Sequence, residues 1–132
     1  MLEENQIVDR AQKVMEILSR QKNMVTTSQI RKFLTAINTV TEKVNAYKLE
    51  NMDKGDTLPI ELQAQIKYLK VKLAYQIGRN RSKWGNPVED FEREAKLMNL
   101  IDSIKNSTKE YEKFAHYMEA LVAFHKFYGG KD

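Results

Sequence analysis

The residues best suited to chemistry in this chain are cations interleaved with aromatic rings, in the stretch 62–88. This stretch holds six Lys or Arg residues and neither Asp nor Glu. On a helix its aliphatic residues fall on one side, while Tyr68, Lys72, Tyr75 and Arg79 form a second stripe well away from them. A packed helix that presents positive charge and flat rings to solvent suits a polyanion whose units can stack, which is a nucleic acid. The alternative is an ordinary solvated face with Tyr rings half buried at the core margin.

Two further cations stand at an unusual place, near the start of another predicted helix. Thr26 and Gln29 have the spacing of a capping box, which predicts that this helix begins at the next residue. Arg31 and Lys32 then lie in its first turn, where the helix dipole makes a cation unfavourable by roughly a few tenths of a kcal/mol. Such a placement is reasonable if both side chains face an external anion such as phosphate.

The charges are segregated along the chain. The windows 17–41 and 62–88 together contain ten of the 22 basic residues and none of the 18 acidic ones, so the net charge of +4 conceals an acidic remainder. Segregation of this kind is evidence about binding partners. Lys67 and Lys70 have helix angles nearer the apolar side than the other cations. The candidate RNA-binding residues are Arg31, Lys32, Lys67, Lys70, Lys72, Tyr75, Arg79, Arg81, Lys83 and Trp84.

Trp84 has two interpretations. It follows Arg81 and Lys83 at the tip of a turn predicted over residues 82–86. A tryptophan among cations could stack on a base or a ribose. The favoured alternative is that its ring fills a gap between two helices.

Groups for catalysis or metal binding are scarce. The chain has no cysteine and only two histidines, His116 and His125. His116 and Glu119 have i, i+3 spacing, but ferritin-like metal sites use the order Glu-x-x-His and need further inward-facing glutamates. We therefore expect no enzymatic activity, no metal and no cofactor. We expect His125 at the margin of the core, with its ring nitrogens hydrogen-bonded.

Glu119 stands between apolar residues on the most apolar predicted helix. A carboxylate in that setting is expected to be paired, because burying an unpaired charge is costly. We expect an ion pair with Arg79 or another base of the third predicted helix, which precedes residue 82. The alternative is that Glu119 reaches solvent.

Length and composition indicate one all-α domain over residues 1–132. Five Gly, two Pro and few apolar residues at period two argue against strands. Periodicity and capping signals predict a single compact bundle of about five helices, at 3–21, 27–50, 59–81, 86–106 and 108–128, with the C-terminal helix central. The acidic N-terminus, the lack of a long apolar run and the absence of cysteine fit a cytoplasmic protein without a membrane partner.

Three segments occur in a recognisable order: TTSQIRKFL (26–34), YLKVKLAYQIGR (68–79) and YMEALVAFHKFYGG (117–130). Together they resemble the small α-helical subunit of type III-A CRISPR effector (Csm) complexes, and EALVAFHKFYGG is the most specific part. The resemblance implies a non-catalytic, RNA-binding subunit of an antiviral ribonucleoprotein. Its copies would stack head to tail beside guide RNA and target RNA and bind other Csm subunits, which would carry the cleavage and signalling activities.

An alternative from another class is a DNA-binding regulator of helix-turn-helix type, with Arg31 and Lys32 in the recognition helix. That motif needs two helices joined by a short turn of about three or four residues. The basic residues here spread over two long predicted helices instead.

Opposite charges on different parts of one domain also suit the heterologous contacts of a stacked assembly.

Overall fold

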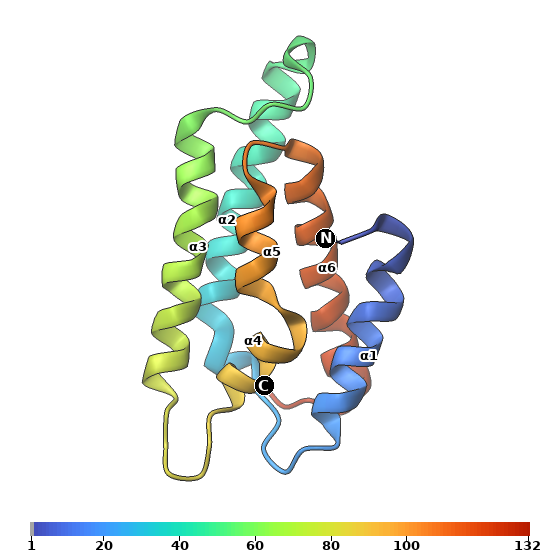
Figure 1. The fold of residues 1–132 in the computed structure, drawn as a ribbon, viewed down its shortest axis with the longest axis vertical. Helices are drawn as coiled ribbons and strands as arrows, with labels where there is room; N and C mark the ends of the chain where they lie inside the picture. Colours follow the sequence, from blue (N-terminus) through green and yellow to red (C-terminus); the bar gives the residue numbers. More distant parts are fainter. Residues whose placement is uncertain (1) are drawn as a thin grey trace.

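Six α-helices and two short 3-10 helices make up residues 2–132, the part of the chain that the computed structural model describes (Figure 1). The all-α prediction is confirmed. None of the helices within residues 2–132 has the length and apolar content to cross a membrane. In chain order the elements are η1 (Glu4–Gln6), α1 (Ile7–Ser19), α2 (Thr27–Glu50), η2 (Met52–Lys54), α3 (Ile60–Arg79), α4 (Pro87–Ala95), α5 (Leu97–Ile104) and α6 (Thr108–Phe127).

Two helix starts follow the signals in the sequence. The Thr26 hydroxyl accepts a hydrogen bond from the Gln29 N–H at 3.2 Å, and the Gln29 side chain accepts one from the Thr26 N–H at 2.9 Å. This is the predicted capping box of α2. The Asn86 side chain accepts a hydrogen bond from the Glu89 N–H at 3.1 Å, with Pro87 at the first position of α4. Both starts are therefore set by local hydrogen bonds that the residue types dictate.

The prediction of one continuous helix over 86–106 is wrong, because the chain bends at Lys96, between α4 and α5. Lys96 has φ 59° and ψ 42°, in the left-handed region. The half-buried Glu92 side chain lies at this bend, and its Oε2 is buried without a hydrogen-bond partner among the described residues. Burial raises the pKa of Glu92, and the nearby backbone N–H groups of Leu97 and Met98 act in the opposite direction. The residues around the bend are good helix formers, so their propensities gave no sign of it.

We expect Lys96→Gly to increase the free energy of unfolding by about 0.5 to 1 kcal/mol, because glycine adopts a positive φ without the steric cost that a Cβ imposes. In a continuous helix the same change would cost about 1 kcal/mol. Urea unfolding measures the difference, and Lys96→Ala is the control because alanine retains the Cβ. A less stable Lys96→Gly protein would contradict the bend.

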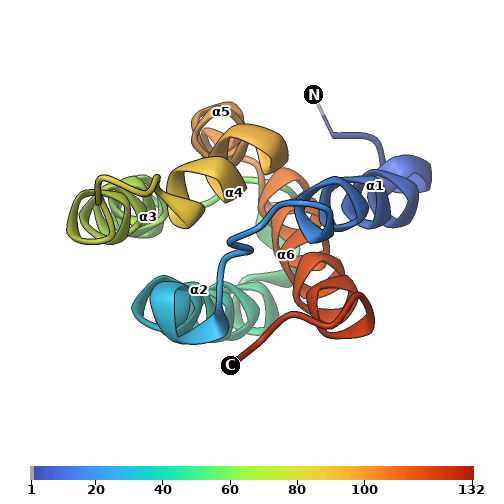
Figure 2. The same ribbon diagram turned by 90° about the horizontal axis from the view of Figure 1, so that it is seen from below.

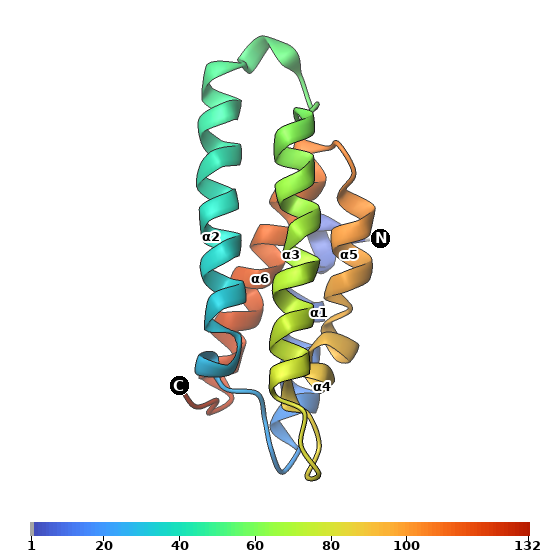
Figure 3. The ribbon, with the colours of Figure 1, turned by 90° about the vertical axis from the view of Figure 1, so that its left-hand side faces the viewer.

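The helices pack around one core, with α2 and α3 antiparallel and α6 between α1 and α2 when seen along the long axis (Figures 2 and 3). The most extensive packing between helices is that of α1 on α6 and of α2 on α3. The short helix α5 packs on both α3 and α6. The core is rich in fully buried aromatic rings. These rings belong to Phe33, Phe91, Tyr111, Phe114 and Tyr117.

The C-terminal helix, α6, is not buried on every side, so a central position for it is not confirmed. Its residues His116, Glu119 and Phe127 are exposed. Glu119 forms no ion pair with Arg79 or with any other described residue. The predicted pairing of Glu119 is therefore wrong, and its carboxylate reaches solvent.

His125 joins the end of α6 to the segment before α2. Its ring is 6% exposed, and Nε2 lies 2.7 Å from the carbonyl oxygen of Val25. The prediction of a hydrogen-bonded histidine at the core margin is confirmed. Gly130 packs directly on this ring, because a Cβ at that position would lie 2.3 to 2.5 Å from three of the ring atoms. Position 130 must therefore lack a side chain.

The C-terminal tail also caps the start of α2. The carbonyl oxygens of Lys131 and Asp132 accept hydrogen bonds from the N–H groups of Thr27 and Ser28, at 3.1 and 2.6 Å. These are two of the donors that a helix start leaves without a partner inside the helix. The tail and the capping box together occupy the backbone donors at this end of α2.

The loop between α2 and α3 is tied to α6 by Asp56. Its carboxylate accepts hydrogen bonds from the Ser107 hydroxyl at 2.6 Å and the Lys109 N–H at 2.7 Å, and its carbonyl accepts one from the Thr108 N–H at 3.0 Å. Partial burial alone would raise the pKa of Asp56, but the hydrogen bonds and the nearby lysines lower it below its usual value. Asp56 therefore fixes the position of the loop over the start of α6.

Candidate nucleic-acid interface

A groove of about 740 Å³ lies between α2 and α3. Because these helices are antiparallel, the N-terminal half of α2 lies beside the middle and C-terminal part of α3 (Figure 3). Arg31 and Lys32 from the first basic window thereby line the same groove as Tyr68 and Lys72 from the second. The groove stays open because several of the facing side chains are short. These short residues are Thr35, Ala36, Thr39 and Ala64.

The predicted division of α3 into two faces is confirmed. The aliphatic stripe of Leu62, Ile66, Leu69 and Leu73 is buried, and Ile77 is half buried against the core. The other stripe is exposed, with Tyr68 57% and Tyr75 61% accessible to solvent. That stripe is Tyr68, Lys72, Tyr75 and Arg79, and it runs along the helix from the groove towards the C-terminal end of α3.

The cations of this surface are free to meet an external anion. Arg31, Lys32, Lys72 and Arg79 are exposed, and none of them forms an ion pair with another residue of the part described. Lys72 lies over the Tyr68 ring, with Nζ 5.9 Å from the ring centroid. The charge and the ring are thus presented together.

Two of the candidate cations point to the other side of α3, towards α5. The Lys70 ammonium lies 2.8 Å from a carboxylate oxygen of Asp102. This hydrogen bond lowers the pKa of Asp102, and the nearby charge of Lys67 adds to the effect. Lys67 and Lys70 therefore lie outside the groove, as their helix angles suggested.

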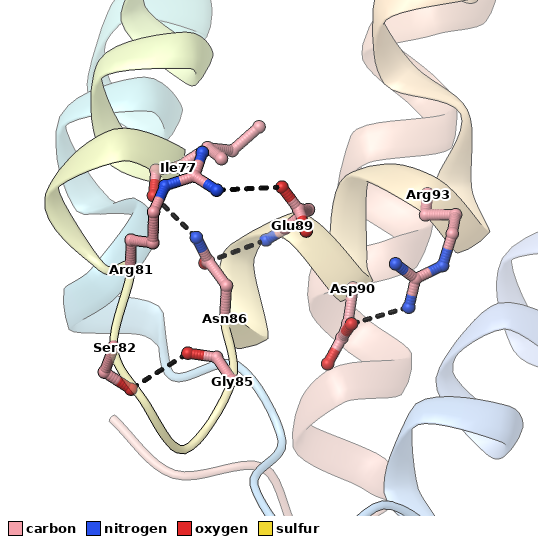
Figure 4. Close-up of polar contacts among 8 residues, drawn as sticks. All are labelled: Ile77, Arg81, Ser82, Gly85, Asn86, Glu89, Asp90 and Arg93. Carbon is pink, nitrogen blue, oxygen red and sulfur yellow. Dashed lines mark hydrogen bonds and ion pairs between the residues drawn. The ribbon is translucent and has the colours of Figure 1, made fainter.

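Arg81 is also partnered within the chain. Its guanidinium lies 3.9 Å from the Glu89 carboxylate of α4 in a solvent-exposed pair (Figure 4). Exposed pairs of this length contribute little to stability and exchange readily for another anion. Arg81 therefore remains a candidate for binding an external anion, although neither Arg81 nor Lys70 lines the groove.

Trp84 is presented to solvent by an ordered turn. The backbone groups of Ser82 and Gly85 exchange two hydrogen bonds of 3.2 Å, and the Ser82 hydroxyl donates to the Gly85 carbonyl at 2.9 Å (Figure 4). Gly85 has φ 119°, which the turn requires and which disfavours any side chain. The Trp84 ring is 77% exposed, with the Lys83 Nζ 5.1 Å from its ring. The interpretation of Trp84 as a filler between helices is wrong.

A second hollow of about 600 Å³ lies beside this turn. It brings together Arg79, Arg81 and Trp84 with Lys22, from the connection between α1 and α2. Lys22 was not among the candidate residues. Its position in the acid-free window 17–41 was the one signal that could have identified it. The exposed stripe of α3 connects this hollow to the groove through Arg79.

The fold and this surface define a small all-helical protein with free cations and exposed rings along one helix pair. Within residues 2–132 no three His, Asp or Glu residues are grouped so that they could hold a metal ion. The family described as Csm2 Type III-A matches residues 2–131. The chain belongs to the Csm2 type III-A family.

Individual relatives agree with this assignment. The CRISPR system Cms protein Csm2 of Streptococcus thermophilus is 32% identical over 135 residues, which span 100% of this chain and 98% of the relative. The protein of the same name from Enterococcus italicus is 34% identical, over 92% of this chain and 84% of its own. The Mycobacterium tuberculosis protein is 32% identical, over 87% and 86% respectively. The resemblance stated from three sequence segments is confirmed.

The helix-turn-helix alternative does not fit the geometry around Arg31 and Lys32. A recognition helix follows its partner helix after about three or four residues. Here the whole segment 20–26 separates α1 from α2, and α2 extends to Glu50. These two cations therefore lie on a long helix of a bundle.

Proposed function

We propose that this chain, a Csm2-family small subunit of a type III-A CRISPR complex, binds RNA phosphates through the α2–α3 groove and has no catalytic role. One observation carries the proposal: α2 and α3 place unpaired cations from both acid-free windows around one groove. Phosphate binding requires cations that are exposed and not already neutralised. Guide RNA and target RNA are the polyanions that such a complex would bring to this surface.

Side chains rather than helix dipoles make the proposed phosphate contacts. The Thr27 and Ser28 N–H groups at the start of α2 already donate to Lys131 and Asp132. The phosphates are therefore bound by Arg31 and by the other cations of the surface. These other cations are Lys22, Lys32, Lys72, Arg79, Arg81 and Lys83.

The exposed rings add contacts that a phosphate-only surface lacks. Tyr75 and Trp84 can stack on bases, and Tyr68 shares the groove with the cations. Stacking requires an accessible base face, which single-stranded or unpaired nucleotides offer and a continuous duplex hides. The aromatic residues thus favour unpaired nucleotides at the ends of the groove.

Head-to-tail stacking of copies is supported by the different character of the two ends of the α2–α3 pair. One end presents Trp84 with the cations around it. The opposite end is mainly apolar and acidic, so it complements the cationic end of the next copy in a heterologous contact. The exposed residues at that opposite end include Leu49, Glu50, Met52, Asp53, Lys54 and Ile60.

A salt titration of RNA binding by the purified chain tests the proposal. With about seven phosphate contacts on single-stranded RNA, log affinity should fall against log salt with a slope of about −5. RNAs of unrelated sequence should bind alike, and longer RNAs should bind cooperatively if copies stack. A slope near zero, or a base preference stronger than the salt dependence, would contradict phosphate binding.

A further inference from the structure

A second groove lies on the other side of α2, between α2 and α6, with a volume of about 500 Å³. The residues of α2 that line it alternate with those that line the cationic groove, so the two grooves open on opposite sides of the same helix. Its floor is apolar and its rim is polar. The floor is formed by Leu34, Ile37, Ala115 and Met118, with Val122 at one edge.

The rim of this α2–α6 groove contains acceptors and no Lys or Arg. Glu112 and Glu119 both lie there, beside His116. Glu112 already meets Lys48 at 2.9 Å, whereas Glu119 is exposed and has no ionic partner among the described residues. The remaining polar residues of the rim are Asn38, Thr41 and Asn45. The charge of this groove is therefore opposite to that of the α2–α3 groove.

Tyr111 fixes the two walls of the groove. Its hydroxyl donates to the Ile37 carbonyl at 3.2 Å and shares a 2.7 Å hydrogen bond with the Thr41 hydroxyl, so α6 is fastened to α2 beneath the opening. Burial raises the pKa of Tyr111 to about 12, against the opposing effect of the Thr41 hydrogen bond. The groove is thus a preformed feature of the bundle.

We propose that the α2–α6 groove binds a lysine- or arginine-bearing segment of another protein subunit of the complex. The aliphatic part of such a side chain packs on Leu34, Ile37 and Met118, while its charged end meets Glu119 at the rim. RNA does not fit this surface, because nothing on the rim neutralises phosphate. The inference rests on membership of a multi-subunit complex and not on RNA binding by the opposite groove.

The first test uses charge reversal in the complex assembled from its co-expressed subunits. Glu119→Lys should reduce recovery of the partner subunit by about tenfold, because like charges then face each other across the contact. Glu42→Lys is the matched control, since Glu42 is an exposed glutamate of α2 that lines neither groove. RNA binding by the isolated Glu119→Lys chain should not weaken, and its melting temperature should stay at the wild-type value.

The second test identifies the occupant. A photo-crosslinking phenylalanine analogue in place of Val122, which is 39% exposed, should capture a segment of another subunit that contains Lys or Arg. Changing that cation to Glu in the partner should restore assembly with Glu119→Lys. Unchanged recovery of all subunits by Glu119→Lys would overturn the inference. Crosslinking to RNA or to a second copy of this chain would overturn it too.

Discussion

Replacing Arg31, Lys32 and Lys72 together with alanine should weaken RNA binding about a hundredfold at low salt. All three line the α2–α3 groove and none is neutralised within the described chain. Each lost phosphate contact removes counterion release worth about 0.7 to 0.9 in the salt slope, so the slope should fall by about 2 to 3. Fluorescence anisotropy with a labelled RNA over a range of salt concentrations measures both quantities.

A matched triple variant distinguishes the loss of the groove's cations from the loss of net positive charge. Lys13, Lys54 and Lys109 are exposed lysines outside both hollows, so their joint replacement by alanine removes the same charge elsewhere. This control should keep most of the wild-type slope, apart from long-range attraction that salt screens. Equal losses of RNA affinity in the two triple variants would show that net charge alone drives binding, and would contradict RNA binding in the α2–α3 groove.

Replacing His125 with alanine should lower the free energy of unfolding by about 2 to 4 kcal/mol. The change leaves the Val25 carbonyl without its 2.7 Å partner and opens a cavity where the ring is buried. Gly130 packs against that ring, so the tail that caps Thr27 and Ser28 should loosen as well. Urea unfolding followed by circular dichroism measures the loss.

His116→Ala is the control for this prediction. His116 lies on the same helix but is exposed, so its removal should change stability by less than about 0.5 kcal/mol. Similar effects of the two substitutions would contradict a stabilising contact of His125 between α6 and the segment before α2. The comparison is sharp because both variants make the same chemical change nine residues apart on one helix.

Helix α2 forms one wall of each of the two grooves. Arg31 and Lys32 lie on one of its sides, and Asn38 and Asn45 lie on the opposite side. The packing of α2 on α3 forms the cationic groove, and the Tyr111 hydroxyl fastens the other side to α6. A single helix can therefore separate an RNA surface from a protein surface, as the two proposals require.

Features that depend on neighbours along the chain were predictable from the sequence. The capping box at Thr26, the start at Asn86 and the two faces of α3 follow from residue types and helical spacing, because hydrogen bonds and side-chain directions within a helix are local. The three characteristic segments also identified the family. The sequence also predicted that His125 would be hydrogen-bonded at the margin of the core, but not that its partner would be the carbonyl of Val25.

Features that depend on which elements meet were decided only by the tertiary structure. Lys70 is paired because α5 brings Asp102 to it, and Trp84 is exposed because its turn projects away from the helices. The bend at Lys96 lies where the half-buried Glu92 side chain meets the start of α5. Helical spacing fixes the direction of a side chain, but packing between helices determines whether an opposite charge, a ring or solvent lies in that direction.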